Sequence, residues 1–176
     1  MLKAQAKVLS FGLIALFIFS VMKPAIAEDI SRGPKSNPES SASALFLTPI
    51  RKIDRNTFTL DLVVDPAGEE INTVSTEISY PVDKLSLLEI NKDNSFCSLF
   101  VEDENDNING KIKISCIKPF PGVDTLSNVV TLTFTTQATG TADLDLSPDS
   151  LVLANDGYGT DVLKAATGQR VNLDLE

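Results

Sequence analysis

The stretch Ile71–Tyr80, "INTVSTEISY", indicates the fold most directly, because its apolar and polar residues alternate with a period of two. Successive side chains of a strand point to opposite faces, so alternation predicts a strand with one buried and one wet face. The residues expected to face inward are Val74, Thr76, Ile78 and Tyr80. The residues expected to face outward are Thr73, Ser75, Glu77 and Ser79.

Runs of the same kind fill the chain from Ala44 onward, separated by Gly, Pro, Asn and Asp. No amphipathic helix of useful length is present, so residues 44–176 predict an all-β domain of two packed antiparallel sheets. The other runs are "ALFLTPI", "TFTLDLVVD", "KLSLLEI", "SFCSLFV", "KIKISCI", "VVTLTFTT", "TADLDL", "SLVLA" and "RVNLDL". Six phenylalanines are expected to supply much of the core: Phe46, Phe58, Phe96, Phe100, Phe120 and Phe134.

The first 27 residues have the pattern of a signal peptide. Lys3 and Lys7 precede an apolar run, "VLSFGLIALFIFSV", and Ala25 and Ala27 supply the small residues of a cleavage site. The alternative is a retained N-terminal anchor. With cleavage, the product is expected to be secreted, extracellular or held at the cell surface. No second apolar run of membrane length follows, so we expect no membrane span in the mature chain.

Residues 28–43, "EDISRGPKSNPESSAS", predict a flexible, disordered spacer, because they are rich in Ser, Pro and charge. The segment before the spacer holds three lysines and no acid. Its removal leaves 12 basic residues against 24 acidic ones, a net charge near −12. Such a charge repels nucleic acid and anionic lipid, so neither is an expected partner.

Cys97 and Cys116 are the two cysteines of the chain, and in an exported protein they predict a disulfide. Closing a loop of about 20 residues restricts the unfolded chain by roughly 3 kcal/mol in the entropic model. The alternative is two free buried thiols. A metal site built on this pair would need further Cys or His ligands, and the chain contains no histidine.

The acidic run Asp103–Gly110, "DENDNING", has the oxygen-rich composition of a calcium loop. An EF-hand loop that begins at Asp103 would require Gly at its sixth position and Glu at its twelfth. Ile108 and Ile114 occupy these positions, so the loop fails both requirements. Asn109-Gly110 is instead a favoured type I′ turn pair ahead of the strand "KIKIS". We therefore predict a turn between two cysteine-bearing strands, and no metal or cofactor, with a calcium site of another geometry as the alternative.

The sequence gives no sign of catalysis. Without histidine, the usual Ser-His and Cys-His nucleophile arrangements are absent. A carboxylate pair could hydrolyse glycosides, but the sequence brings no two carboxylates together. We therefore predict a protein that is not an enzyme.

The second half of the chain carries a family resemblance. "VVTLTFTTQATGTADLDLSPDSLVLANDGYGTDVL", residues 129–163, resembles the C-terminal half of divergent cohesin domains in exported bacterial proteins. "INTVSTEISYPVDKLSLLEI" resembles the cohesin element in which an alternating strand ends in Tyr. The family usually has Asp-Pro after that Tyr, whereas Tyr80 is followed here by Pro81-Val82-Asp83. "FCSLFVEDENDNINGKIKISCIKPFPG" resembles the cysteine-bearing middle of the divergent group.

The resemblance implies a jelly-roll sandwich of about nine strands that binds dockerin modules and assembles polysaccharide-degrading enzymes. It implies a partner-binding face built from two strands. The well-studied dockerin-binding pattern has Asn and Asp near the positions of Thr73 and Ser75, and this sequence lacks both. The residues of the implied face are Thr73, Ser75, Glu77, Ser79, Lys111, Lys113 and Ser115.

Three functions therefore remain as hypotheses. The first is a cohesin-type module that binds a protein partner, a dockerin-like module. The second is carbohydrate binding, with a surface polysaccharide as partner, although such sites rely on exposed aromatic rings and the chain has no Trp. The third is an adhesive surface subunit. The segment "ANDGYGTD" is expected to be a tight loop, in which Gly157 and Gly159 give backbone freedom while Asn155 and Asp156 make local hydrogen bonds.

Overall fold

The computed structural model describes residues 42–174, so the predicted signal peptide and most of the predicted spacer lie outside the described residues. The elements of these residues are all strands. The described residues therefore contain no helix that could cross a membrane. The strands are β1 (Ala44–Leu47), β2 (Arg51–Lys52), β3 (Thr57–Asp65), β4 (Ile71–Ser79), β5 (Leu85–Asn91), β6 (Leu99–Asp106), β7 (Lys111–Ile117), β8 (Ser127–Thr136), β9 (Gly140–Leu146), β10 (Leu151–Ala154), β11 (Ala165–Thr167) and β12 (Gln169–Leu173).

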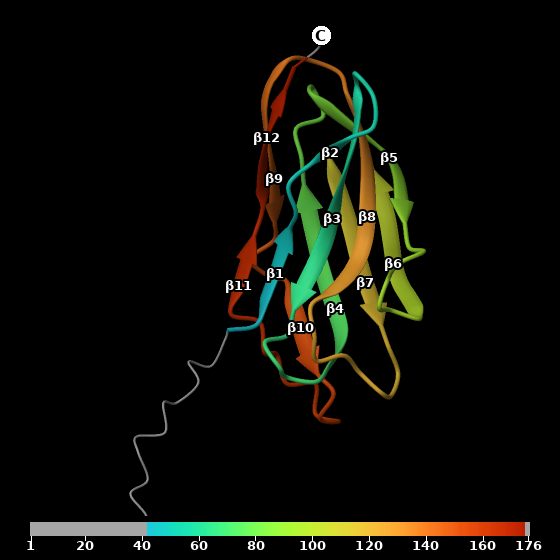
Figure 1. Ribbon diagram of the computed structural model, residues 1–176, viewed down its shortest axis with the longest axis vertical. Helices are drawn as coiled ribbons and strands as arrows, with labels where there is room; N and C mark the ends of the chain where they lie inside the picture. The colour runs from blue at the N-terminus through green and yellow to red at the C-terminus, as the bar shows by residue number, and fades with distance from the viewer. Residues whose placement is uncertain (1–41, 175–176) are drawn as a thin grey trace, which may run out of the picture. The chain divides into compact units, whose positions relative to one another are not determined.

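Two sheets make the sandwich (Figure 1). The first sheet has the order β11-β1-β3-β8-β5, with β2 beside β3. The second has the order β12-β9-β4-β7-β6, with β10 beside β4. Every neighbouring pair is antiparallel except β1 and β11, which are parallel. The predicted all-β, two-sheet jelly-roll class is confirmed, with one parallel pair that the sequence did not indicate.

The core lies between the sheets and follows the alternation seen in the sequence. On β4, Val74, Thr76 and Ile78 are buried, and Tyr80 is buried just beyond the strand. The ring of Tyr80 meets Phe134 edge to face, and the ring of Phe58 stacks on that of Phe134. The predicted inward residues of this strand are therefore correct.

Two of the six phenylalanines expected in the core do not lie there. Phe120 is 86% exposed, in the loop between β7 and β8. Phe46 is only half-buried, because it alternates with the buried Leu45 and Leu47 and so faces outward on β1. Composition alone cannot assign a phenylalanine to a face, whereas its place in the alternation can.

Strands β9 and β10 both lie along the same edge of β4. Leu146 of β9 pairs with Ile78, and Leu151 of β10 pairs with Ser75. Between them, the link Ser147–Ser150 leaves the ladder and returns to it. Its turn is closed inside by a hydrogen bond of 2.7 Å between the hydroxyls of Ser150 and Thr76. Ser147 and Asp149 of the link line a hollow together with Ser75 and Glu77, so the link borders the outer surface of the second sheet.

Candidate protein-binding face

The seven residues of the predicted face lie together on the outer face of the second sheet. In the β4–β7 ladder, Ser75 pairs with Ser115, Glu77 with Lys113, and Ser79 with Lys111. Thr73 pairs with Ile117, two residues further along each strand. Their neighbours within the strands, such as Val74 and Ile114, are buried, so the seven side chains point away from the core.

Three further strands, β6, β9 and β10, widen this surface, and the strand register arranges its side chains in four cross-strand rows. We name the rows by their place along β4. Row one is Leu153, Thr73, Ile117 and Leu99. Row two is Leu151, Ser75, Ser115 and Glu102. Row three is Glu77, Lys113 and Glu104. Row four is Asp145, Ser79, Lys111 and Asp106.

An open hollow of about 300 Å³ lies at the middle of this face. It is lined from β4 by Ser75, Thr76 and Glu77, from β6 by Glu102, from β7 by Lys113, and from the β9–β10 link by Ser147 and Asp149. The small side chains of Ser75 and of the neighbouring Ser115 leave the space, while longer charged side chains surround it. Three of the seven predicted residues, Ser75, Glu77 and Lys113, therefore line a recess in this face.

Some charges on the face are already engaged within the protein. The amine of Lys111 lies 2.5 Å from a carboxylate oxygen of Glu77. The carboxylate of Asp106 accepts hydrogen bonds from the side chain of Asn109 and from the backbone N–H groups of Asn109 and Ile108, with the shortest at 2.6 Å. These bonds, led by that of the Asn109 side chain, hold the pKa of Asp106 below its usual value. The carboxylate of Asp106 is therefore engaged in hydrogen bonds to the turn that follows it.

The prediction that the acidic run is a loop is wrong over most of its length. Residues 99–106 form β6, which pairs with β7. The turn covers only residues 107–110, and Gly110 alone has a positive φ there, +67°. A type I′ turn at Asn109-Gly110 would require positive φ at both residues, so that prediction is also wrong.

The turn connects the two sheets through Asn107. Its Oδ1 accepts a hydrogen bond of 2.9 Å from the N–H of Leu87 on β5, and its Nδ2 donates one of 3.0 Å to the carbonyl of Leu87. The hydroxyl of Tyr80 also donates to Asn107. The second sheet thus covers backbone groups at the edge of the first.

No group of three or more Cys, Asp or Glu side chains within residues 42–174 is placed to hold a metal ion. Along the acidic run, successive carboxylates point to opposite faces of β6, because Asp103 pairs with the buried Ile114 and Glu104 pairs with Lys113. Asp103 forms an ion pair with Lys92. The carboxylates of this run do not converge on one point.

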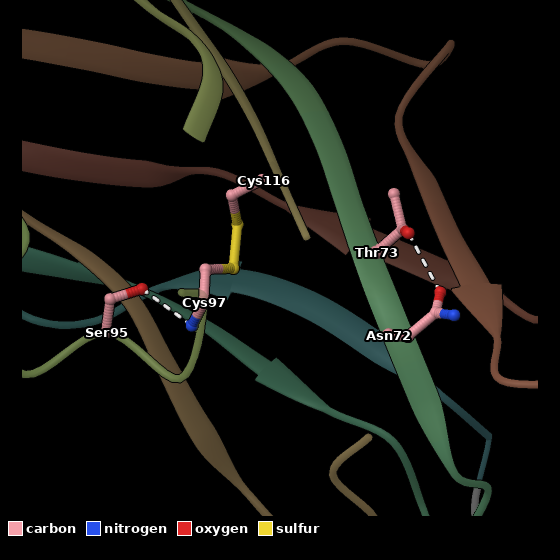
Figure 2. Close-up of a disulfide and its surroundings, with 5 residues drawn as sticks. All are labelled: Asn72, Thr73, Ser95, Cys97 and Cys116. Atoms are coloured by element: carbon pink, nitrogen blue, oxygen red, sulfur yellow. Dashed lines mark hydrogen bonds between the residues drawn. A yellow bond between two sulfur atoms is a disulfide. The ribbon is translucent and has the colours of Figure 1, made fainter. Parts of the chain in front are cut away.

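Cys97 and Cys116 form the predicted disulfide (Figure 2). Their Cα atoms lie 5.8 Å apart, and both residues are buried. Cys116 belongs to β7, whereas Cys97 precedes β6, where its N–H donates to the hydroxyl of Ser95. Placing Cys97 on a strand was therefore wrong, although the pairing was correct.

On the outer face of the second sheet, the hydroxyl of Thr73 donates a hydrogen bond to the side chain of Asn72 (Figure 2).

Sequence reasoning missed the flanks of the face. Leu151 and Leu153 of β10, and Glu102 and Glu104 of β6, lie in the same rows as the predicted residues. For β10 the signal was available, because "SLVLA" alternates around the buried Val152. For β6 no signal existed, since most of its residues are exposed on both sides and no alternation results.

The loop "ANDGYGTD" closes on itself, largely as predicted. Asp156 accepts from the N–H groups of Tyr158 and Gly159, at 2.8 and 3.1 Å, and from the hydroxyl of Thr160. Gly157 and Gly159 both have positive φ. Asn155, however, bonds outside the loop, with Asn72 and Glu70, so the expected local bonds of Asn155 are wrong.

Comparison with known proteins bears on the fold. Neither a protein-family model nor a curated protein sequence matches the chain. Among solved structures, the sixth cohesin of Acetivibrio cellulolyticus scaffoldin B, solved with a Cel5 dockerin, covers 76% of this chain and 100% of its own, with a TM-score of 0.62 and 14% identity.

Two other cohesins are similar in the same way. A non-cellulosomal cohesin from the archaeon Archaeoglobus fulgidus has a TM-score of 0.61 and 13% identity, over 75% of this chain and 91% of its own. The cohesin module of a Clostridium perfringens family 33 glycoside hydrolase has a TM-score of 0.55 and 19% identity, over 74% of this chain and 97% of its own. The part of the chain that the structure describes therefore has the cohesin fold.

Proposed function

We propose that the protein is a non-enzymatic binding module that captures a dockerin-like protein module on the outer face of its second sheet. The observation that carries the proposal is that the seven predicted residues lie on one outer face, where three of them, Ser75, Glu77 and Lys113, line a recess. The cohesin fold adds support, because structurally similar cohesins have been solved in complexes with dockerins.

The outer face of the first sheet is a natural internal control. It is rich in threonine, and Thr59 pairs there with Thr133. Its ion pair joins Arg51 to Asp61 through two hydrogen bonds of 2.6 and 2.9 Å. The Arg51 guanidinium holds the pKa of Asp61 below its usual value, and Thr131 donates a further hydrogen bond. The charges of Arg51 and Asp61 on this face therefore satisfy each other.

The test is binding to a panel of purified dockerin modules, with and without calcium, measured by calorimetry. The protein is produced by export so that its disulfide forms. We expect at least one dockerin to bind, and Ser75→Arg to abolish this binding by filling the recess. Thr133→Arg, at a half-buried position of the other outer face, is the matched control and should bind normally. No binding across a broad panel would refute the proposal.

Export from the cell, and a role beside polysaccharide-degrading enzymes, belong to the same proposal. The disulfide supports export, because such bonds persist in oxidising compartments. The mass of the protein recovered from the culture medium tests the cleavage, and it should correspond to a chain beginning at Glu28. A recovered chain that retains the first 27 residues would contradict the predicted signal peptide.

Carbohydrate binding keeps one specific observation in its favour. Tyr158 is 91% exposed, and Phe120 is exposed in a neighbouring loop. Glu70 joins the two loops, since its carboxylate accepts from the N–H of Gly122 at 2.9 Å and from the side chain of Asn155 at 2.6 Å. Exposed rings of this kind can pack on sugar faces. A glycan array tests this candidate, and binding that survives Tyr158→Ala and Phe120→Ala would count against it.

A further inference from the structure

The chemistry of the outer face changes steadily from one end of β4 to the other. The four rows are two residues apart along β4 and β7, so row one and row four are separated by about 20 Å. Row one holds three aliphatic side chains and no charge, whereas row four holds two carboxylates and an amine. The face therefore has a direction.

The apolar end is open to a partner. Leu99 is 55% exposed and Leu151 is 40% exposed, while Ile117 and Leu153 between them are half-buried. They belong to three different strands, so they form a patch rather than a single projecting side chain. Covering such a patch with apolar side chains of a partner removes apolar surface from water and so stabilises the complex.

From row two to row four, the face has an excess of negative charge. Within residues 42–174, the ion pairs of this face are Lys111 with Glu77 and, at its margin, Arg170 with Asp143. Lys113 is left as the cation among several carboxylates that belong to no ion pair of the described residues. These carboxylates are Glu102, Glu104, Asp145 and Asp149.

The hollow lies at rows two and three, next to the apolar row one. Glu102 enters its lining from β6, and Asp149 enters from the β9–β10 link on the opposite side. A positively charged side chain that enters this space would lie between two carboxylates on opposite sides of the hollow. An anionic side chain would meet Lys113 but would also approach both carboxylates, and like charges repel at such distances.

We propose that the partner presents a segment with aliphatic side chains at one end and a Lys or Arg about 10 Å further along. The aliphatic end lies on row one, and one cationic side chain enters the hollow between Glu102 and Asp149. This inference rests on the proposed function, since it names the chemistry and direction of the partner for that same face.

The experiment uses two small probes, so it needs no dockerin. Backbone NMR spectra of the full protein are recorded during titration with Nα-acetylarginine amide and, separately, with Nα-acetylleucine amide. The arginine probe should shift the amide signals of Ser75, Ser115 and Glu102. The leucine probe should shift those of Thr73 and Ile117. Nα-acetylglutamate amide is the control and should shift neither group.

Variants test whether the carboxylates of the hollow are responsible. Glu102→Gln and Asp149→Asn should each weaken binding of the arginine probe about two- to fivefold, as expected for partly exposed charges. Glu89→Gln, on the outer face of the first sheet, should leave it unchanged. An arginine probe that binds elsewhere, or equally well to all three variants, overturns the inference.

The two proposals fail in different ways. If dockerins bind while the arginine probe does not enter the hollow, the direction assigned to the face is wrong and the proposed function stands. If the probes bind as expected while no dockerin binds, the class of partner is wrong and the assigned chemistry stands.

Discussion

Two polar, glycine-containing segments, Asp103–Gly110 and Ala154–Asp161, are alike in sequence but differ in structure. In both, an aspartate accepts hydrogen bonds from nearby backbone N–H groups, Asp106 in the first and Asp156 in the second. The first segment continues into a contact with the other sheet through Asn107. The second contacts Asn72 and Glu70 of its own sheet and a neighbouring loop through Asn155, and it presents the exposed Tyr158 to solvent. Local turn chemistry is therefore the same, while the tertiary contacts are not.

The largest difference is expected at the glycines. A Cβ on Gly110 would lie 2.1 Å from the carbonyl oxygen of Tyr80 and 2.8 Å from Cγ1 of Val82, at a φ of +67°. Gly110→Ala thus adds a backbone clash to the cost of a left-handed conformation. We expect a loss of about 3 kcal/mol or more in the free energy of unfolding, measured with urea. A loss below that of Gly157→Ala would show that the close approach at Gly110 is absent.

The next effect concerns Asn107. Asn107→Ala removes the partner of the N–H and carbonyl of the buried Leu87, and of the Tyr80 hydroxyl. Unpaired buried groups of this kind cost about 2–3 kcal/mol together. Asn155→Ala is the matched control in the second segment, because its partner Glu70 is exposed and can bind water instead. Equal losses for the two variants would contradict the bridge between sheets.

Gly157→Ala should have a smaller effect. Gly157 has a φ of +77°, but no atom lies within 4 Å of a Cβ built there. Only the backbone conformation is penalised, so we expect a loss of about 1 kcal/mol. The same urea titration measures this loss. A loss as large as that of Gly110→Ala would mean that a Cβ at position 157 clashes with a neighbouring part of the protein.

The smallest effect should be shared by both segments. Hydrogen bonds hold the pKa of Asp106 and of Asp156 below the ordinary value of 3.8, led by the Asn109 side chain and by Thr160 respectively. Each carboxylate stabilises the fold fully above pH 3.8 and loses this contribution as the pH falls through its lower folded pKa. Asp106→Asn and Asp156→Asn should therefore both reduce the acid dependence of unfolding. If only one variant reduced the acid dependence of unfolding, the two aspartates would not stabilise their segments in the same way, contrary to our expectation.

The sequence was informative wherever one face of a strand is buried. Alternation in residues 71–80 and 111–117 predicted the strands and their inward sides, whereas the choice of seven outward residues as a partner-binding face came from the family resemblance. It failed at β6, an edge strand that is exposed on both sides and therefore shows no alternation. It also failed for Asn107, because a bond to Leu87 depends on how the two sheets meet rather than on local sequence.

The parallel pairing of β1 with β11 has a consequence for the order of folding. β1 pairs with β3 soon after the chain has formed both, but its other neighbour begins at Ala165, 121 residues after Ala44. A chain that emerges N-terminus first therefore leaves one edge of β1 unpaired until almost all of it is available. Unpaired strand edges invite association with other chains. During biogenesis, this edge is where a folding helper would be of most use.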